Sequence, residues 1–179
     1  YKRQAMEEGM SIRSLFYPRA VAIIGSVSKG KIGYELARQL LEGGYHSLYA
    51  VNPKSQGVFS IAGYDAIHKI GRPVDLAVIV SPAATVARTL EECGQAGVQM
   101  AIIITAGFSE VGNVEAEEEL KRTAARCGVR FVGPNCAGVV NTAHRLFATL
   151  ETRPPAGGVA VIAQSGAIGG LMMAWAREY

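Results

Sequence analysis

Short runs of valine and isoleucine that alternate with longer amphipathic segments constrain the fold of this chain more than any other feature of its sequence. Apolar runs of this length predict strands buried on both faces, and the segments between them have the period of helices. Repeated strand and helix units with right-handed crossovers give a doubly wound parallel sheet, so we predict a Rossmann-like α/β fold. The predicted strands lie at 20–25, 47–51, 75–80, 99–105 and 129–132, and the predicted helices at about 31–42, 83–96 and 113–127, with a short one near 64–69.

The alternation of predicted strands and helices stops after residue 140. A polar, proline-containing stretch over 141–157 resembles an interdomain linker. The apolar run 159–163 and the turn that follows it predict another strand and helix, which cannot bury a core by themselves. We therefore predict the following division: an N-terminal tail at 1–10 with the basic pair Lys2 and Arg3, a Rossmann-like domain at 11–140, a linker at 141–157, and the start of a truncated second, flavodoxin-like α/β domain at 158–179.

Composition excludes several classes of protein. The net charge is only +3, from 18 basic and 15 acidic residues, and no basic stripe is interleaved with aromatics, so nucleic acid is not an expected partner. No stretch approaches the roughly 20 apolar residues that cross a bilayer, so no membrane is expected either. Cys93, Cys127 and Cys136 form no CxxC pair and are odd in number, which fits a reducing cytoplasm. The three histidines lack metal-ligand spacing, and no metal site is predicted.

The loop after the first predicted strand carries three glycines, Gly25, Gly30 and Gly33. Glycine permits close backbone approach, and the following helix offers free N–H groups to a phosphate. The spacing is GxxxxGxxG rather than the GxGxxG of dinucleotide folds, so glycines that serve only a tight turn are the alternative. Lys31 at the helix start is either a phosphate contact or a solvated side chain.

The loop after the second predicted strand reads Asn52, Pro53, Lys54. An NAD-binding fold would place an acidic residue here to hold the ribose hydroxyls. The acid is missing, and Lys54 stands where a phosphorylated ribose would need a cation. NADP and CoA both carry such a phosphate, so Lys54 distinguishes either from NAD but not one from the other. An ordinary surface lysine is the alternative.

Three further loops are expected at the same edge of the sheet, because parallel strands all end there. They follow the strands that end at Val80, Thr105 and Val132. Ser81 could instead cap the next helix. The small residues and few charges in these loops predict a long groove that suits a cofactor with a slender arm. A dehydrogenase needs a proton-transfer group near the hydride site, and no histidine or acid stands out in these loops.

Six motifs, in order and at suitable spacing over nearly the whole chain, resemble one family. That family comprises the α-subunit type chain of succinyl-CoA synthetase and the ADP-forming acetyl-CoA synthetases, together called NDP-forming acyl-CoA synthetases. The motifs are LFYPRAVAIIGS at 15–26, VNPK at 51–54, VDLAVIVSPA at 74–83, IITAGFSE at 103–110, GPNCAG at 133–138 and AQSGAIGG at 163–170.

The resemblance implies that the first domain binds coenzyme A along this edge. It places the CoA phosphates in the first loop, the phosphorylated ribose in the second, the adenine and pantetheine along the next two, and the thiol end at the last. Cys136 is expected to be a packed free thiol rather than a nucleophile. The implied CoA-binding residues are Gly25, Ser26, Val27, Ser28, Lys31, Gly33, Asn52, Pro53, Lys54, Val80, Ser81, Pro82, Thr105, Ala106, Gly107, Phe108, Asn135 and Cys136.

The resemblance also implies an acid–thiol ligase, which converts acid, CoA and nucleoside triphosphate into acyl-CoA, diphosphate and phosphate through an acyl phosphate and a phosphohistidine. No histidine here matches the phosphorylated one, so this fragment alone is expected to be inactive. Mg, ATP and ADP are expected only in the missing parts, on an ATP-grasp domain or β subunit of an oligomeric enzyme. The helix N-terminus expected to receive the phosphohistidine carries Ser165, Gly166 and Ala167, where Ser165 as a simple cap is the alternative.

Two other functions stay open on the sequence. One is a non-catalytic CoA-binding or regulatory module, for example one fused to a protein acetyltransferase. The other is an NADP-dependent oxidoreductase domain, which the Rossmann form and Lys54 would also fit.

Overall fold

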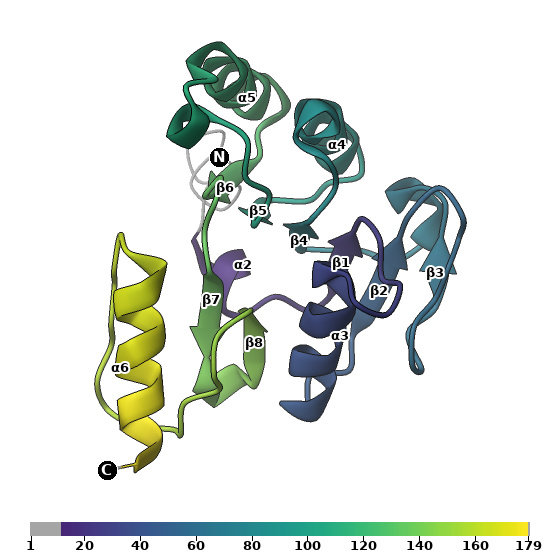
Figure 1. Ribbon diagram of the computed structural model, residues 1–179. Coiled ribbons are helices and arrows are strands. Elements are labelled where there is room, and N and C mark those ends of the chain that lie inside the picture. Colours follow the sequence, from purple (N-terminus) through teal and green to yellow (C-terminus); the bar gives the residue numbers. More distant parts are fainter. Residues whose placement is uncertain (1–11, 179) are drawn as a thin grey trace, which may run out of the picture.

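The computed structural model describes residues 12–178 and places a six-stranded parallel sheet at the centre of the chain (Figure 1). The strand order β3-β2-β1-β4-β5-β6 reverses direction around β1, as in a doubly wound sheet. The predicted fold class is therefore confirmed, while the tail predicted for 1–10 lies outside the described residues. The strands are β1 (Val21–Ile24), β2 (Leu48–Val51), β3 (Gly63–Tyr64), β4 (Leu76–Ile79), β5 (Met100–Ile103) and β6 (Arg130–Val132).

The central strands are apolar throughout because both faces of the sheet are covered. Every residue of β1, β4 and β5 is buried. In register, Val21 pairs with Leu48 on one side and with Leu76 on the other. This double coverage explains why the sequence shows continuous valine and isoleucine runs rather than alternation.

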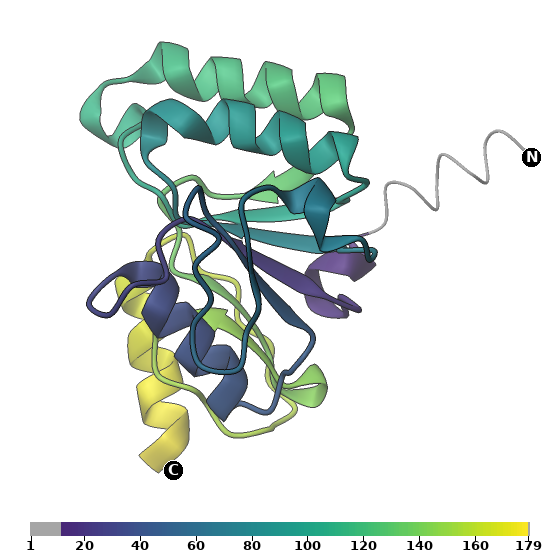
Figure 2. The same cartoon turned by 90° about the vertical axis from the view of Figure 1, so that its right-hand side faces the viewer.

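Helices pack on both faces of the sheet (Figure 2). On one face α3 (Ile32–Glu42) buries Leu36 and Leu40 against residues of β1 and β2. On the other face α4 (Ala83–Gln95) and α5 (Val114–Cys127) cover a second apolar cluster. These helices match the predicted segments to within a residue or two. The short elements are α2 (Arg13–Phe16) and three 3₁₀ turns, η1 (Ile67–Ile70), η2 (Ser109–Val111) and η3 (Thr142–His144).

A β-hairpin that the sequence analysis did not predict follows the sheet. Strands β7 (Gly138–Asn141) and β8 (Leu146–Thr149) pair antiparallel, and β8 is buried along its whole length. The ring of Phe147 lies against the end of α3 so closely that a side chain at Gly43 would collide with it. Part of the stretch predicted as a linker therefore forms regular structure, and Leu146 and Ala148 pack in the same core as α3 and the sheet.

The last part of the chain runs without regular structure from 150 to 165 and then forms α6 (Gly166–Glu178) beside the hairpin (Figure 1). The strand predicted over 159–163 does not form. Its residues are exposed, with Val159 at 86% and Ile162 fully so. No neighbouring strand is present in the described part of the chain to accept its backbone hydrogen bonds, and an isolated strand is not stable.

Candidate functional site

All six strands of the sheet are parallel, so the loops that follow them meet at one edge, which we call the rim. Most of the residues predicted to bind a cofactor lie there, in the loops after β1, β2, β4, β5 and β6. In doubly wound sheets ligands bind outside the carboxyl ends of the strands, at the point where strand order reverses. Here that point lies between β1 and β4.

The loop after β1 can exist only with glycine at two positions. A Cβ on Gly25, where φ is +138°, would lie 2.8 Å from the side chain of Val80 at the end of β4. A Cβ on Gly33, in the first turn of α3, would lie 2.5 Å from the carbonyl oxygen of Ser26. The glycines thus bring the loop, the end of β4 and the N-terminus of α3 into direct contact.

This arrangement leaves backbone N–H groups available to an anion. No side chain caps the N-terminus of α3, whose N-cap residue is Lys31. The first N–H groups of a helix lack internal partners and carry partial positive charge. Val27, by contrast, is buried in the core, so its predicted contribution to binding is limited to its backbone.

The loop after β2 is organised by Asn52, which is itself buried. Its Oδ1 accepts hydrogen bonds from the backbone N–H groups of Lys54 (3.2 Å) and Gln56 (3.0 Å), and its Nδ2 donates to the Gln56 carbonyl (2.8 Å). The Asn52 amide is therefore occupied by its own loop. Its effect is to hold Lys54, whose side chain stays exposed, at the rim.

The first two loops are joined to each other. The Ser28 hydroxyl donates to Gln56 Oε1 (3.0 Å), and the rings of Tyr34 and Phe59 contact at 4.8 Å between centroids. Lys29, Lys31 and Lys54 are exposed on these loops, and within the described residues none of the three forms an ion pair. Three unneutralised cations beside an uncapped helix N-terminus suit a ligand with several phosphates.

The loop after β4 contains a buried hydroxyl without a partner. Ser81 Oγ is shielded from solvent and makes no hydrogen bond within residues 12–178. It does not cap α4, which begins after Pro82 without a side-chain cap, so the capping alternative for Ser81 is wrong. Thr105 Oγ1, from the loop after β5, donates to the Ser81 carbonyl (2.8 Å). An unpaired buried hydroxyl is costly, which points to a polar ligand group at this position.

The loop after β5 is closed by an acidic residue that sequence reasoning left unassigned. The Glu110 carboxylate accepts hydrogen bonds from the backbone N–H groups of Gly107 and Phe108. These bonds, the Gly107 bond above all, hold the pKa of Glu110 below its ordinary value. The two N–H groups are thus not free for a ligand, and the ring of Phe108 is buried under α5. Ala106 is exposed in this loop. The only sign of this closure in the sequence is that Glu110 follows Gly107 by three residues.

The loop after β6 places a thiol and a left-handed residue at the far end of the rim. The Gly133–Pro134 peptide bond is cis, and Asn135 has φ +52° with its N–H bound to the Thr105 carbonyl (3.0 Å). Cys136 Sγ donates to the Ile103 carbonyl (3.4 Å), and burial raises the pKa of its thiol. These contacts favour the packed thiol over a nucleophile, which would need an accessible thiolate.

The N-terminus of α6 lies beside this same loop. A Cβ on Gly166 would be 3.2 Å from the Cβ of Ala137, which directly follows Cys136. The Ser165 hydroxyl accepts from the Ile168 N–H (3.4 Å), so Ser165 does cap the helix. The turn 164–167, which the family resemblance predicts to receive a phosphohistidine, thus lies next to the predicted thiol end of the rim.

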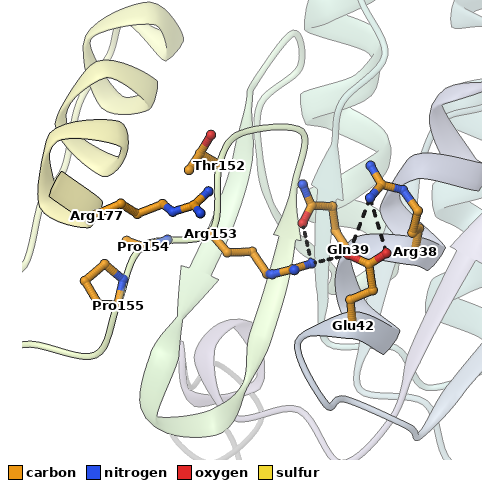
Figure 3. Close-up of a pocket in the computed structure, with 8 residues that line it drawn as sticks. All are labelled: Arg38, Gln39, Glu42, Thr152, Arg153, Pro154, Pro155 and Arg177. Carbon is orange, nitrogen blue, oxygen red and sulfur yellow. Dashed lines mark hydrogen bonds and ion pairs between the residues drawn. The ribbon is translucent and has the colours of Figure 1, made fainter.

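A polar cavity of about 550 Å³ lies away from the rim, between the last turns of α3 and α6 (Figure 3). Its walls carry three arginines and one glutamate. It is lined by Arg38, Gln39, Glu42, Thr152, Arg153, Pro154, Pro155 and Arg177.

Among residues 12–178 no group of three or more His, Cys, Asp and Glu side chains could hold a metal ion. In that range no helix combines the length and the apolar character needed to cross a membrane. His144 Nε2 lies 2.9 Å from the Pro18 carbonyl between Tyr17 and Tyr45, and His46 and His68 are exposed.

Comparison with known protein families gives one domain match. The sequence profile described as "CoA binding domain" covers residues 19–142, which includes every strand of the central sheet and the first strand of the hairpin.

Two relatives in sequence are ADP-forming acetate–CoA ligases. The chain is 46% identical over 159 residues to an acetate–CoA ligase (ADP-forming) of Methanocaldococcus jannaschii, which covers 88% of the chain and 22% of that protein. It is 44% identical over 176 residues to the α subunit of acetate–CoA ligase (ADP-forming) I of Pyrococcus furiosus, which covers 93% and 38%. The chain thus spans between about a fifth and two fifths of the length of these relatives.

A solved structure of similar fold is the dinucleotide-forming acetyl-coenzyme A synthetase 1 of Ca. Korarchaeum cryptofilum in complex with phosphate and ADP. It superposes with a TM-score of 0.85 at 39% identity, and the match covers 92% of this chain and 36% of that one.

Proposed function

The chain belongs to the CoA-binding domain family, and from this premise we propose that it binds coenzyme A along the rim, as one part of an ADP-forming acyl-CoA synthetase. The observation that carries the proposal is the rim itself. Its first two loops combine glycine-dependent backbone contacts, an uncapped helix N-terminus and three unpaired lysines, which together suit the phosphates of CoA.

The proposed path of CoA follows the order of the loops. The diphosphate lies in the loop from Gly25 to Gly33, and the 3′-phosphate lies near Lys54. Asn52 and Pro53 shape the second loop rather than supply charge, because the Asn52 amide is internally bonded. The adenine and pantetheine pass Val80–Pro82 and 105–108, where the Ser81 hydroxyl lacks a partner. The thiol ends near Asn135 and Cys136.

The proposed wider activity is that of an acid–thiol ligase. Support comes from relatives named ADP-forming acetate–CoA ligases, of which this chain represents only a part. In such an enzyme the helix N-terminus with Ser165, Gly166 and Ala167 receives a phosphohistidine from elsewhere in the protein. Its place beside Ala137 supports this role, because the acyl phosphate, which exchanges its phosphoryl group with the histidine, must form next to the CoA thiol that takes the acyl group and releases phosphate. Mg and ATP or ADP belong to an ATP-grasp domain or β subunit of a cytoplasmic, oligomeric enzyme, and the fragment alone does not turn over.

The segment after the hairpin is proposed to begin a second α/β domain. Residues 159–163 have the composition of a buried strand and yet are exposed, and α6 also exposes Trp175 and Leu171. Apolar side chains in such number on one segment indicate a surface that further protein covers.

Replacement of Lys54 by alanine tests the proposed position of the 3′-phosphate. We expect CoA to bind roughly two- to fivefold more weakly to Lys54→Ala, because an exposed charge contact contributes up to about 1 kcal/mol. Dephospho-CoA, which lacks this phosphate, should bind the variant and the unchanged chain equally well. Isothermal titration with both ligands measures the difference.

Lys121→Ala is the matched control, because it removes the same charge from the outer face of α5, away from the rim. Its CoA affinity should be unchanged. An equal loss of CoA and dephospho-CoA binding in Lys54→Ala would place the 3′-phosphate elsewhere.

A further inference from the structure

A single arginine fastens the segment after the hairpin to the last turns of α3. Arg153 Nη1 donates to Gln39 Oε1 (2.9 Å) and to Glu42 Oε2 (2.8 Å). Gln39 Nε2 in turn donates to the backbone carbonyl of Glu151 (3.1 Å), two residues before Arg153. Figure 3 shows these side chains reaching toward one another across the cavity from α3 and from the segment. We call this group of contacts, made by Gln39, Glu42, Glu151 and Arg153, the latch.

The latch is better placed than an isolated surface ion pair. The Arg153 side chain is only 32% exposed. Glu42 is shared between Arg153 and Arg38, and the bond from Arg153 contributes most to holding the pKa of the Glu42 carboxyl below its ordinary value. Networks of this kind exceed the small stabilisation of a single exposed pair.

The chain stiffens immediately after the latch. Pro154 and Pro155 fix φ at two successive residues, and the residue before a proline is restricted as well. Because the latch fixes Arg153 and the two prolines restrict the backbone that follows, the direction of the chain after Arg153 is largely determined.

The three arginines of the cavity do not describe a site for an anion. Arg177 belongs to the last turn of α6, and the last turn of α3 follows directly after Arg38. The carbonyl ends of both helices carry partial negative charge. Arg38 is already paired with Glu35 and Glu42. The guanidinium groups are thus explained by helix ends and carboxylates, and an anion there would meet two unfavourable dipoles. The latch residues that line the cavity therefore serve to hold the segment after the hairpin against α3.

Few other contacts hold α6 to the body of the protein. One is the approach of Gly166 to Ala137 at the rim, and another is the approach of Gly170 to the Glu151 carboxylate. Gly170 is the one buried residue of α6 among those described. Since Glu151 is also an anchor of the latch, the position of α6 depends on the segment that the latch fixes.

We infer that Arg153 is a positioning residue, which holds the segment 150–155 against α3 and so keeps α6, with its N-terminal turn at 164–167, in place beside Ala137. One end of α3 thereby carries the latch while the other end faces the first rim loop. The proposal that the turn 164–167 receives a phosphohistidine rests on the proposed function, whereas the positioning of α6 by Arg153 does not.

The test uses Trp175, the single tryptophan of the chain, which lies on α6 and is 56% exposed. Time-resolved fluorescence anisotropy of Trp175 separates tumbling of the whole chain from local motion of the helix. We expect Arg153→Ala to increase the amplitude of the fast component at least twofold. Arg153→Lys, which keeps one charged donor, should restore part of the loss.

Arg177→Ala is the matched control, since Arg177 lines the same cavity and forms no ion pair or hydrogen bond within the described chain. It should leave the decay unchanged. Glu42→Gln removes the charge that pairs with Arg153 and keeps the shape of the side chain, so it should increase the fast component in the same direction as Arg153→Ala. This second variant decides the question even if Arg153→Ala folds poorly.

An unaltered decay in Arg153→Ala, or an equal increase in Arg177→Ala, would overturn the inference. The anisotropy decays of the unchanged chain and of all variants are measured without CoA. A chain that bound no CoA would therefore refute the proposed function and leave this result standing.

Discussion

Replacement of Gly33 by alanine is expected to weaken CoA binding at least tenfold and to lower stability. Alanine is normally the better helix former by about 1 kcal/mol, so the substitution would stabilise α3 if space allowed. The added methyl group would lie 2.5 Å from the carbonyl oxygen of Ser26. Either the first rim loop or the N-terminus of α3 must then move, and both are proposed to hold the diphosphate. Loss of one charge-assisted hydrogen bond, about 1.5–3 kcal/mol, corresponds to ten- to a hundredfold in affinity.

Gly169→Ala provides the matched control for this experiment. Gly169 also lies in a helix, and a Cβ there would meet only an ordinary contact at 3.8 Å. We expect unchanged CoA affinity and an equal or higher melting temperature in that variant. Wild-type affinity in Gly33→Ala, measured by calorimetric titration, would show that the contact with Ser26 does not shape the site.

Replacement of Leu40 by alanine is expected to cost about 2–5 kcal/mol of unfolding free energy. Leu40 is fully buried in the cluster that joins α3, the sheet and the hairpin. Truncation removes apolar contacts and leaves a cavity that this packed interface can only partly close. Because domains are stable by only about 5–15 kcal/mol, the loss is a large fraction of the total. The midpoint of urea unfolding measures it.

Ile32→Ala serves as the comparison on the same helix. Ile32 is 47% exposed at the start of α3, and its truncation should change stability by about 0.5 kcal/mol or less. Equal effects of the two substitutions would contradict the burial of Leu40 between α3 and the sheet.

The central strands could be predicted from sequence because burial on both faces makes them apolar without interruption. β1, β4 and β5 are examples, and each falls inside a predicted run. β3 has only Gly63 and Tyr64, too few residues to show a pattern. The same reasoning failed at 159–163, where the pattern of a buried strand exists but residues 12–178 supply no adjacent strand.

The hairpin could not be predicted because its position depends on tertiary packing. β8 has four buried residues, yet Arg145 precedes it and polar residues and prolines follow, so the region resembles a linker. What fixes the hairpin is the fit of Phe147 against Gly43, which lie more than a hundred positions apart in sequence. Local patterns carry no information about such a contact.

Sequence reasoning located the loops of the candidate site and missed the way their side chains are used. The spacing of Gly25 and Gly33 and the cation at 54 predicted a phosphate-binding rim. The internal bonds of Asn52, the unpaired hydroxyl of Ser81 and the closure of a loop by Glu110 depend on distances between side chains and backbone. These features emerge only when the loops are folded against one another.

The most direct test of the central claim is isothermal titration of the chain with CoA, with NADP and NAD titrated in parallel. The account predicts that CoA binds and that neither NADP nor NAD does. Binding of NADP without competition from CoA would contradict it, and would identify the phosphate-binding rim as that of an oxidoreductase domain.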